Sequence, residues 1–294
     1  MDPSRMLPNL RGRIFLFDFN HPDDSAIEVT LNGDFDRENF FPHGISLYED
    51  QKTAEVRLFV VNHHISDQER IEIFRFDENA TSLNHLKTVT GENIHSVNDV
   101  LAVGPESFYY TNDWYFVNKF GKMAEMLSGL CWGTVGYYHD GQDAIVARGL
   151  RMANGINMSP DGRYLYVAAA FQGQVVVFER QEGGSLEEKQ RIDLCLGADN
   201  IEIDKRSGDL WLGCQSVLYK LFQHGMNVTN PAASQVLRIR PGSKSAPYAS
   251  PDIREIFVDD GTLASSSSVA SYYDDKLLVG TVLDRLVYCE IKTF

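Results

Sequence analysis

Five oxygen-bearing side chains occupy equivalent positions in a degenerate repeat of this 294-residue chain. Each repeat opens on a polar residue, a small or polar residue and an aliphatic residue, and a short apolar strand follows. The openings supply Asn98, Asp99, Asn154, Asp199 and Asn200. Carboxylate and carboxamide oxygens from separate strands suit Ca²⁺, which takes about 6–8 oxygen ligands in a flexible geometry. Asn, Asp and Gly also favour turns, so the metal interpretation depends on several openings acting together.

Two histidines belong to the first repeat. His43 opens it, and His63 ends its strand. A histidine pair could activate water as a general base, while a bound Ca²⁺ could polarise a carbonyl group. Either ring could equally be a buried, hydrogen-bonded strand residue. His64 should point to the opposite face of the strand and is excluded.

Other nucleophiles have weaker support. The chain has no Gly-x-Ser-x-Gly elbow, which argues against a serine α/β-hydrolase. Cys214 could act as a nucleophile, but a buried apolar role is favoured because no base is evident nearby. The four cysteines, Cys131, Cys195, Cys214 and Cys289, are scattered without a C-x-x-C pair, so neither a zinc site nor a compact disulfide framework is predicted.

The elements that must position these groups are short β-strands. β-Branched and aromatic runs lie at residues 14–17, 56–61, 71–76, 164–167, 175–178, 277–279 and 286–288. The apolar spacing over residues 119–130 predicts one short helix. Repeat openings at residues 43, 98, 154, 199 and, more weakly, 268 lie 45 to 69 residues apart. Propeller blades of four strands run about 40–50 residues. A β-sandwich would not explain the recurring triplet, so we predict an all-β propeller forming a single domain over residues 1–294.

Charge and apolar content exclude some functions. The net charge of −14 argues against a nucleic-acid partner, because backbone binding needs clustered Lys and Arg. No apolar run approaches the roughly 20 residues that span a bilayer, and the first residues carry no secretory signal. Two glycosylation sequons, at Asn79 and Asn227, hint at a secretory history.

Longer segments carry a family resemblance. FFPHGIS (40–46), VVNHH (60–64), VNDVLAVGPESFYYTND (97–113), ANGINMSPDGRYLYVA (153–168), the ADNIEID and GDLWLGC segments within 198–214, and the KLLVGTV and LVYCEI segments within 276–291 resemble the paraoxonase family, in order and over nearly the whole chain. The resemblance implies a six-bladed propeller with two calcium ions. It also implies hydrolysis of small-molecule lactones and, in many members, of aryl esters and some organophosphates.

The same resemblance implies roles for individual residues. The catalytic calcium would be held by Asn98, Asn154, Asp199 and Asn200. Asp99 and the backbone carbonyl of Ile45 would hold the structural calcium, and His43 and His63 would form the catalytic histidine dyad.

The chain also departs from the family pattern. It begins after the family's hydrophobic N-terminal segment, a cysteine, a Glu-Asp pair and a first inner strand, so we expect a closing strand and one carboxylate of each calcium site to be missing. Cys289 matches a cysteine whose disulfide partner is absent, and Trp114 replaces a usual histidine. Membrane or lipoprotein association is possible in the full-length family, but the N-terminal segment that it uses is absent from this sequence.

Three interpretations follow. The favoured one is a truncated form of an active, secreted or secretory-pathway enzyme, with aryldialkylphosphatase activity as a side reaction. A second is a catalytically impaired propeller that serves as a binding platform. A third, a sugar lactonase of the gluconolactonase group, is disfavoured by the length of the matching segments.

Overall fold

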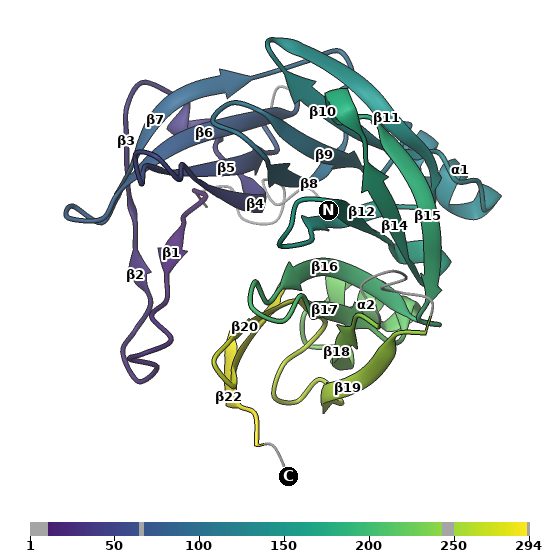
Figure 1. Ribbon diagram of the computed structural model, residues 1–294. Helices are drawn as coiled ribbons and strands as arrows, with labels where there is room; N and C mark the ends of the chain where they lie inside the picture. The colour runs from purple at the N-terminus through teal and green to yellow at the C-terminus, as the bar shows by residue number, and fades with distance from the viewer. Residues whose placement is uncertain (1–10, 65–67, 243–249, 293–294) are drawn as a thin grey trace. The chain divides into compact units, whose positions relative to one another are not determined.

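The computed structural model describes residues 11–64, 68–242 and 250–292, and the chain in these ranges is mostly β-strand (Figure 1). It forms two compact units, residues 1–149 and 150–294. The expected single domain over residues 1–294 stays a prediction. No helix in the described ranges is both long and apolar enough to cross a membrane.

The first unit holds a small ribbon and two larger sheets. The ribbon pairs β1 (Phe15–Leu16) with β2 (Ile27–Glu28). One sheet has the order β3-β7-β6-β5-β4, and the other β11-β10-β9-β8. The bounds are β3 (Thr30–Asn32), β4 (Pro42–Glu49), β5 (Val56–Asn62), β6 (Arg70–Asp77), β7 (Ser82–Val89), β8 (Val97–Ala102), β9 (Phe108–Asn112), β10 (Gly133–His139) and β11 (Gln142–Leu150).

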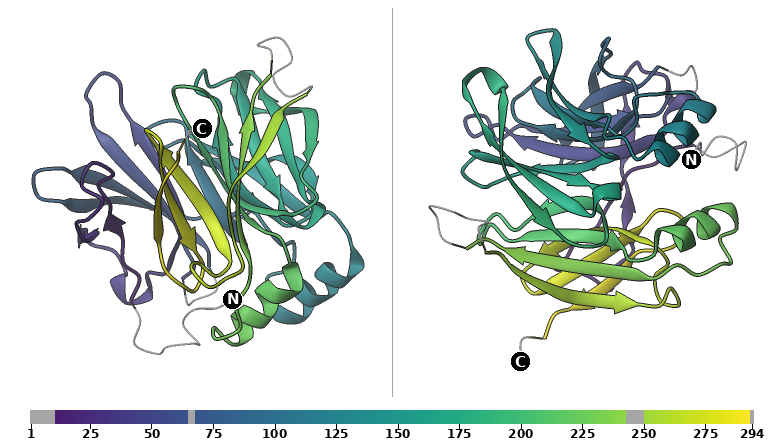
Figure 2. Two further views of the ribbon diagram at one scale, coloured as in Figure 1. Left: turned by 90° about the horizontal axis from the view of Figure 1, so that it is seen from below. Right: turned by 90° about the vertical axis from the view of Figure 1, so that its right-hand side faces the viewer.

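The second unit holds three sheets of consecutive antiparallel strands (Figure 2). Their orders are β12-β13-β14-β15, β16-β17-β18-β19 and β20-β21-β22. The bounds are β12 (Ala153–Met158), β13 (Tyr164–Ala169), β14 (Gln174–Arg180), β15 (Leu186–Asp193), β16 (Gly197–Ile203), β17 (Leu210–Gln215), β18 (Ser234–Arg240), β19 (Asp252–Asp259), β20 (Ser267–Tyr273), β21 (Lys276–Thr281) and β22 (Val287–Glu290).

These five sheets are blades of the β-propeller type, so the all-β expectation is confirmed and the expected number of six blades is wrong. The ribbon of β1 and β2 does not make a sixth blade, because each strand has only two residues and no further strand joins them within the described ranges. The last blade, β20-β21-β22, has three strands where each of the others has at least four.

Two short helices interrupt the strands. The predicted helix is present as α1 (Lys119–Ser128). The side chain of its N-cap residue, Asn118, accepts a hydrogen bond from the backbone N–H of Gly121, and its C-cap residue, Gly129, has a left-handed backbone conformation. The second helix, α2 (Leu218–Met226), was not predicted. Its preceding residue, Val217, makes no side-chain cap, so the sequence carries no start signal there.

Every blade is irregular at the same point. The pairing of the first strand with the second shifts register at the residues that open each repeat. The shifts lie between Pro42 and Ile45, Val97 and Val100, Ala153 and Ile156, Ala198 and Ile201, and Ser267 and Val269. A β-bulge inserts an extra residue and re-aims its side chain away from the regular pleat. The polar openings of the repeat are therefore the bulged residues.

Glycine lets first strands of neighbouring blades approach closely within each unit. A Cβ atom on Gly44 in β4 would lie 2.6 Å from the Cα atom of Asp99 in β8. A Cβ atom on Gly155 in β12 would lie 2.5 Å from the Cα atom of Asn200 in β16. Both neighbours are backbone, which cannot swing away as a side chain can. The glycine of the His-Gly-Ile and Asn-Gly-Ile triplets is thus required by packing.

The same constraint gives a stability test at Gly213 in β17. A Cβ atom there would lie 2.3 Å from the backbone nitrogen of Val269, so Gly213→Ala must displace β20. We expect the substitution to lower the free energy of unfolding by about 2–3 kcal/mol, measured by urea denaturation. Gly104→Ala is the matched control, because its nearest neighbour is the side-chain Cβ of Ser107 at 3.3 Å. An equal, small loss in both variants would contradict the close-approach argument.

Candidate active site

The two predicted histidines lie in hydrogen-bond contact in the first unit. His43 is in β4, and His63 follows the last residue of β5. The Nδ1 atom of His43 lies 3.0 Å from the Nε2 atom of His63, and the ring centroids are 4.8 Å apart in an edge-to-face arrangement. Tertiary pairing of β4 with β5 thus joins side chains that are 20 residues apart in the chain.

A carboxylate that the sequence analysis missed lies on the other side of His63. The Oε2 atom of Glu69 is 2.7 Å from the Nδ1 atom of His63. The contact therefore extends through three side chains, from Glu69 to His63 to His43. No spacing rule identifies Glu69, which lies outside the strands and directly precedes β6.

Asn62 fixes the ends of the two strands that carry the histidines. Its fully buried side chain accepts a hydrogen bond from the backbone N–H of Phe41 at 2.8 Å and donates one to Glu72 at 3.0 Å. The backbone N–H of His63 also donates to the carbonyl of Phe41 at 3.1 Å. These bonds hold Asn62, which precedes His63, against Phe41, which lies two residues before His43. They therefore limit how far the two rings can separate.

The surroundings keep His43 neutral. Although the residue is exposed to solvent, the protein around its ring disfavours the charged form and lowers the pKa of His43 below its ordinary value, and the nearby His63 adds to the effect. A lowered pKa leaves the ring unprotonated at pH 7. His43 is therefore in the state that can accept a proton.

A second carboxylate, Asp113, lies near His63 and Glu69. Burial raises the pKa of Asp113, while Lys122 and a 2.6 Å hydrogen bond from the Ser96 hydroxyl oppose that shift. His63 and Glu69 act on the carboxyl through their charges. Lys122 also donates to the Ser96 hydroxyl at 3.0 Å, so the charge of Asp113 has its counter-ion nearby.

The residues predicted to bind calcium in the first unit lie at the bulge of β8. Asn98 and Asp99 are buried, and the Asp99 carboxylate lies against Gly44, the residue before Ile45. The Oδ1 atom of Asp99 accepts a hydrogen bond from the backbone N–H of Val100 at 2.8 Å. Within the described ranges, the Oδ1 atom of Asn98 is buried and accepts no hydrogen bond. A buried oxygen in this state is destabilising unless a donor or a cation meets it.

The predicted ligands of the second unit surround one carboxylate. Asp199, at the bulge of β16, receives hydrogen bonds from the side chain of Asn154 and from Gln215, whose Nε2 atom lies 2.7 Å away. Burial nevertheless raises the pKa of Asp199 to about 7. Asn200 donates to the backbone carbonyl of Ser268 at 3.0 Å. Asn154, Asp199 and Asn200 are thus brought together, and Gln215 is a contact that the sequence analysis missed.

The donor chemistry around Asp199 fits calcium better than a transition metal. No group of three His, Cys, Asp or Glu side chains in the described part of the chain is arranged to bind a metal. A site at the bulges would therefore use amide and backbone oxygens beside a single carboxylate, and hard oxygen donors suit Ca²⁺. A cation would also stabilise the charged form of the desolvated Asp199. The assignment of Asn98 to the same ion stays a prediction.

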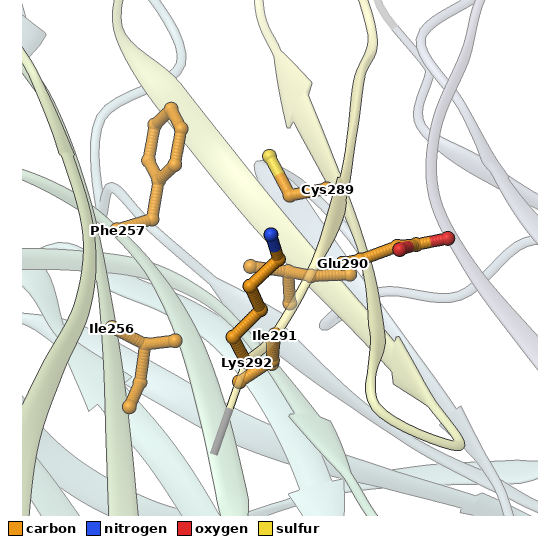
Figure 3. A pocket seen from close by; sticks show the side chains of 7 residues that line it. Ile256, Phe257, Cys289, Glu290, Ile291 and Lys292 are labelled. Atoms are coloured by element: carbon orange, nitrogen blue, oxygen red, sulfur yellow. The ribbon is translucent and has the colours of Figure 1, made fainter. Parts of the chain in front are cut away.

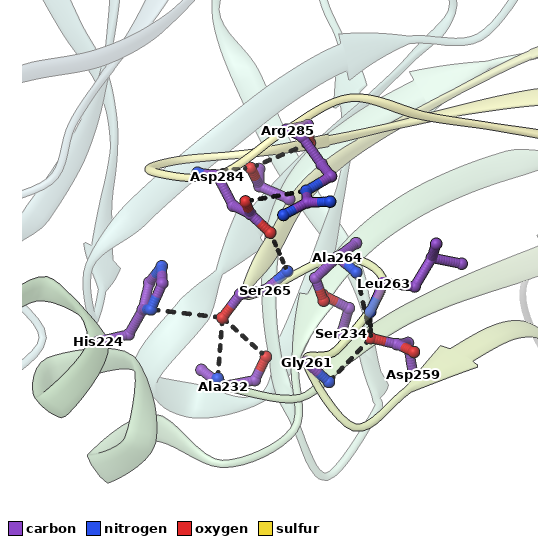
Figure 4. Close-up of polar contacts among 11 residues, drawn as sticks. His224, Ala232, Ser234, Asp259, Gly261, Leu263, Ala264, Ser265, Asp284 and Arg285 are labelled. Atoms are coloured by element: carbon purple, nitrogen blue, oxygen red, sulfur yellow. Dashed lines mark hydrogen bonds and ion pairs between the residues drawn. The ribbon is translucent and has the colours of Figure 1, made fainter. Parts of the chain in front are cut away.

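A serine–histidine pair in the second unit is structural (Figure 4). His224 and Ser265 are buried, with 1% and 4% of their surfaces exposed. The Nδ1 atom of His224 lies 2.8 Å from the backbone carbonyl oxygen of Asn230, so it carries the proton and donates it there. It cannot accept a proton from the Ser265 hydroxyl 3.3 Å away. The arrangement therefore lacks a base for the serine.

An apolar cavity of about 280 Å³ lies beside the last strand, β22 (Figure 3). Ile256, Phe257 and Leu277 contribute to its wall with Cys289, and the charged side chains at its edge are Glu290 and Lys292. No histidine lines it, so this cavity offers apolar surface without an acid–base pair.

The four cysteines, Cys131, Cys195, Cys214 and Cys289, are all free thiols. Cys214 is fully buried, and burial raises the pKa of its thiol. A neutral, enclosed thiol is a poor nucleophile. The structure therefore favours the packing role for Cys214.

Comparison with known proteins decides the family. A family model described as Arylesterase matches residues 4–291. The chain belongs to the arylesterase family. It is 40% identical to human serum paraoxonase/arylesterase 1 over 285 residues, covering 97% of this chain and 78% of that protein. It is 42% identical to chicken (Gallus gallus) serum paraoxonase/arylesterase 2 over 284 residues, with the same coverage. The paraoxonase resemblance is thereby confirmed, and the family supports a hydrolase of the ester- and lactone-cleaving class.

Solved structures of differently named proteins share the fold of this chain. A putative 6-phosphogluconolactonase from Bacteroides uniformis matches with a TM-score of 0.55 at 12% identity, covering 94% of this chain and 86% of that chain. A periplasmic gluconolactonase from Pseudomonas aeruginosa gives 0.51 at 14% identity, with 96% and 81% coverage. A nidogen/laminin complex gives 0.53 at 11% identity, with 90% and 80% coverage. Because one of these is not named as an enzyme, the fold alone does not decide the activity.

The state of the thiols gives a direct chemical test. With iodoacetamide under native conditions, we expect the exposed Cys195 to be alkylated fully before Cys214 reacts measurably, because alkylation requires an accessible thiolate. Peptide mass spectrometry measures both sites in one sample, and unfolding in urea should abolish the difference. Early labelling of Cys214 in the folded protein would contradict its packing role.

Proposed function

We propose that this arylesterase is a calcium-dependent hydrolase of lactones and aryl esters, in which His43 and His63 activate the attacking water. The observation that supports the proposal most directly is the 3.0 Å contact between the two rings, with His43 neutral. A neutral ring can take a proton from water, and a second ring in contact with it can share the resulting charge.

The residues divide the work between base and charge stabilisation. His43 takes the proton of the water that attacks the carbonyl carbon, and His63 holds the His43 ring in place. A bound Ca²⁺ would supply polarisation of the carbonyl and compensation of the negative charge that grows on its oxygen. Asn154, Asp199 and Asn200 would hold this ion, and the family resemblance adds Asn98 to them. Asp99 and the carbonyl oxygen of Ile45 would hold a second, structural ion.

The proposal includes a small-molecule substrate and a secreted or secretory-pathway setting. The relatives named above are called serum proteins. Asn79 is exposed in the turn between β6 and β7, where a glycan would meet no packed side chain. A histidine whose pKa is lowered is unprotonated at pH 7 and is therefore available as a base.

Calcium binding is the first test. Titration of the metal-free protein with CaCl₂ in a calorimeter should show saturable binding, and Ca²⁺ should raise the Tm. Asp199→Asn removes the only carboxylate of the Asn154–Asp199–Asn200 group and should weaken binding by at least about 10–100-fold. Asp204→Asn is the control, because this nearby carboxylate caps a turn through Arg206 and Ser207. Absence of calcium binding by the wild-type protein would overturn the proposal in favour of a binding platform.

The histidine role is tested with phenyl acetate and δ-valerolactone. His43→Gln should lower kcat by about 10²–10⁴-fold, because it removes the general base, while calcium binding stays at the wild-type level. His64→Gln is the matched control: this neighbouring ring contacts Asp36 at 3.0 Å instead of His43. A His43 variant with wild-type kcat would exclude the histidine mechanism.

A further inference from the structure

We propose that Glu69 is the positioning carboxylate of the histidine pair, which fixes the proton of His63 on Nδ1 and so directs the lone pair of His43 towards the reacting water. This inference rests on the function proposed above, and it assigns a role to a residue that the sequence pattern did not single out.

The contact is short and partly shielded from water. The Glu69 Oε2 atom lies 2.7 Å from the His63 Nδ1 atom, and the two side chains are 18% and 27% exposed. A carboxylate at this distance makes a charge-assisted hydrogen bond, which is stronger than one between neutral groups. Among the described residues, the hydrogen-bond partner of Glu69 is His63.

The contact determines the tautomers of both rings. A carboxylate only accepts hydrogen bonds, so the Nδ1 atom of His63 must carry a proton. In the neutral ring its Nε2 atom then has the lone pair, and it accepts the hydrogen bond from the Nδ1 atom of His43. The remaining nitrogen of His43, Nε2, is left with the lone pair that can take a proton from water.

The same three side chains can move positive charge from His43 to His63. When His43 Nε2 gains the proton of water, the ring becomes cationic, and its Nδ1 proton is already aimed at His63. Transfer of that proton to His63 Nε2 would place the cation beside the negative Glu69. In the balance, the oxygen–hydrogen bond of water breaks and a nitrogen–hydrogen bond forms at His43 Nε2, while the transfer breaks the Nδ1–H bond of His43 and forms an Nε2–H bond on His63. The electron pair of the water oxygen forms the bond to the carbonyl carbon, and the π electron pair of the carbonyl group moves to its oxygen.

Two other histidine–carboxylate pairs of the first unit show what distinguishes Glu69. Glu72 contacts the Nε2 atom of His85 at 2.9 Å, but it also accepts hydrogen bonds from Asn62 and Thr88, so it belongs to a buried structural network. Asp36 contacts the Nε2 atom of His64 at 3.0 Å and also caps the turn at Asn39. Glu69 alone among these carboxylates contacts a ring that in turn contacts His43.

The decisive experiment combines kinetics with nitrogen NMR of the intact protein. Glu69→Gln keeps the size of the side chain, but its amide can donate to Nδ1 and so select the other tautomer of His63. We expect kcat for phenyl acetate to fall by about 10–100-fold, less than on loss of the base itself, with KM unchanged within about twofold. Glu69→Asp should recover part of the loss. Asp36→Asn is the matched control, because it removes the carboxylate from a histidine outside the relay.

The NMR measurement separates this inference from the proposed function. In ¹⁵N-histidine-labelled protein, which has eight histidines, the His63 signals are assigned by their loss in His63→Gln. Wild-type His63 should show a protonated Nδ1 and an unprotonated Nε2, and Glu69→Gln should change this pattern. An unchanged tautomer with wild-type kcat would overturn the role of Glu69. If the wild-type protein cleaves neither ester nor lactone, the proposed function fails, while the tautomer result still decides whether Glu69 positions the ring.

Discussion

The irregular start of every blade is the constraint on which the rest of the molecule depends. At each start, the first strand shifts register against the second, and within each unit glycine lets the first strands of neighbouring blades approach backbone to backbone. The bulge turns a polar side chain out of the regular pleat, and the missing Cβ atom makes room for the next strand. The same few residues therefore serve both packing and chemistry. Gly155, which follows Asn154 in the chain, packs against the backbone of Asn200.

Several polar groups at the bulges are buried, and the free-energy cost of burying them changes their affinity for protons and cations. Asp199 keeps three side-chain neighbours that donate to it and still has a pKa raised to about 7. Asn98 keeps a buried oxygen that accepts no hydrogen bond within the described ranges. The protein around the exposed His43 and the nearby His63 lower the pKa of that ring. Such groups are stabilised by a cation or by a transferred proton, which a regular, fully paired strand would not need.

The fold alone does not decide the activity, and the side chains of the candidate site reduce the number of possible reactions. A likeness at TM-scores just above 0.5 joins this chain to a gluconolactonase and also to a nidogen/laminin complex. In this chain, the side chains at the openings of the repeat narrow the possible chemistry. Serine and cysteine chemistry lacks support here, because Ser265 has no base and Cys214 is enclosed and protonated. The proposed histidine relay instead offers a ring, His43, whose lowered pKa and contact with His63 suit it to accept a proton.

The sequence by itself determined the family, the all-β class, a helix within residues 119–130 and the openings that carry His43, Asn98, Asn154 and Asp199. Those features depend on local patterns: alternation, helical spacing and a repeated triplet. Only the tertiary structure decided the number of blades, the contact of His43 with His63, and the partners Glu69 and Gln215. These depend on strand register and on segments that meet after folding. A hydrogen bond between distant residues leaves no periodic trace in the chain, because it needs only one matching atom at each end.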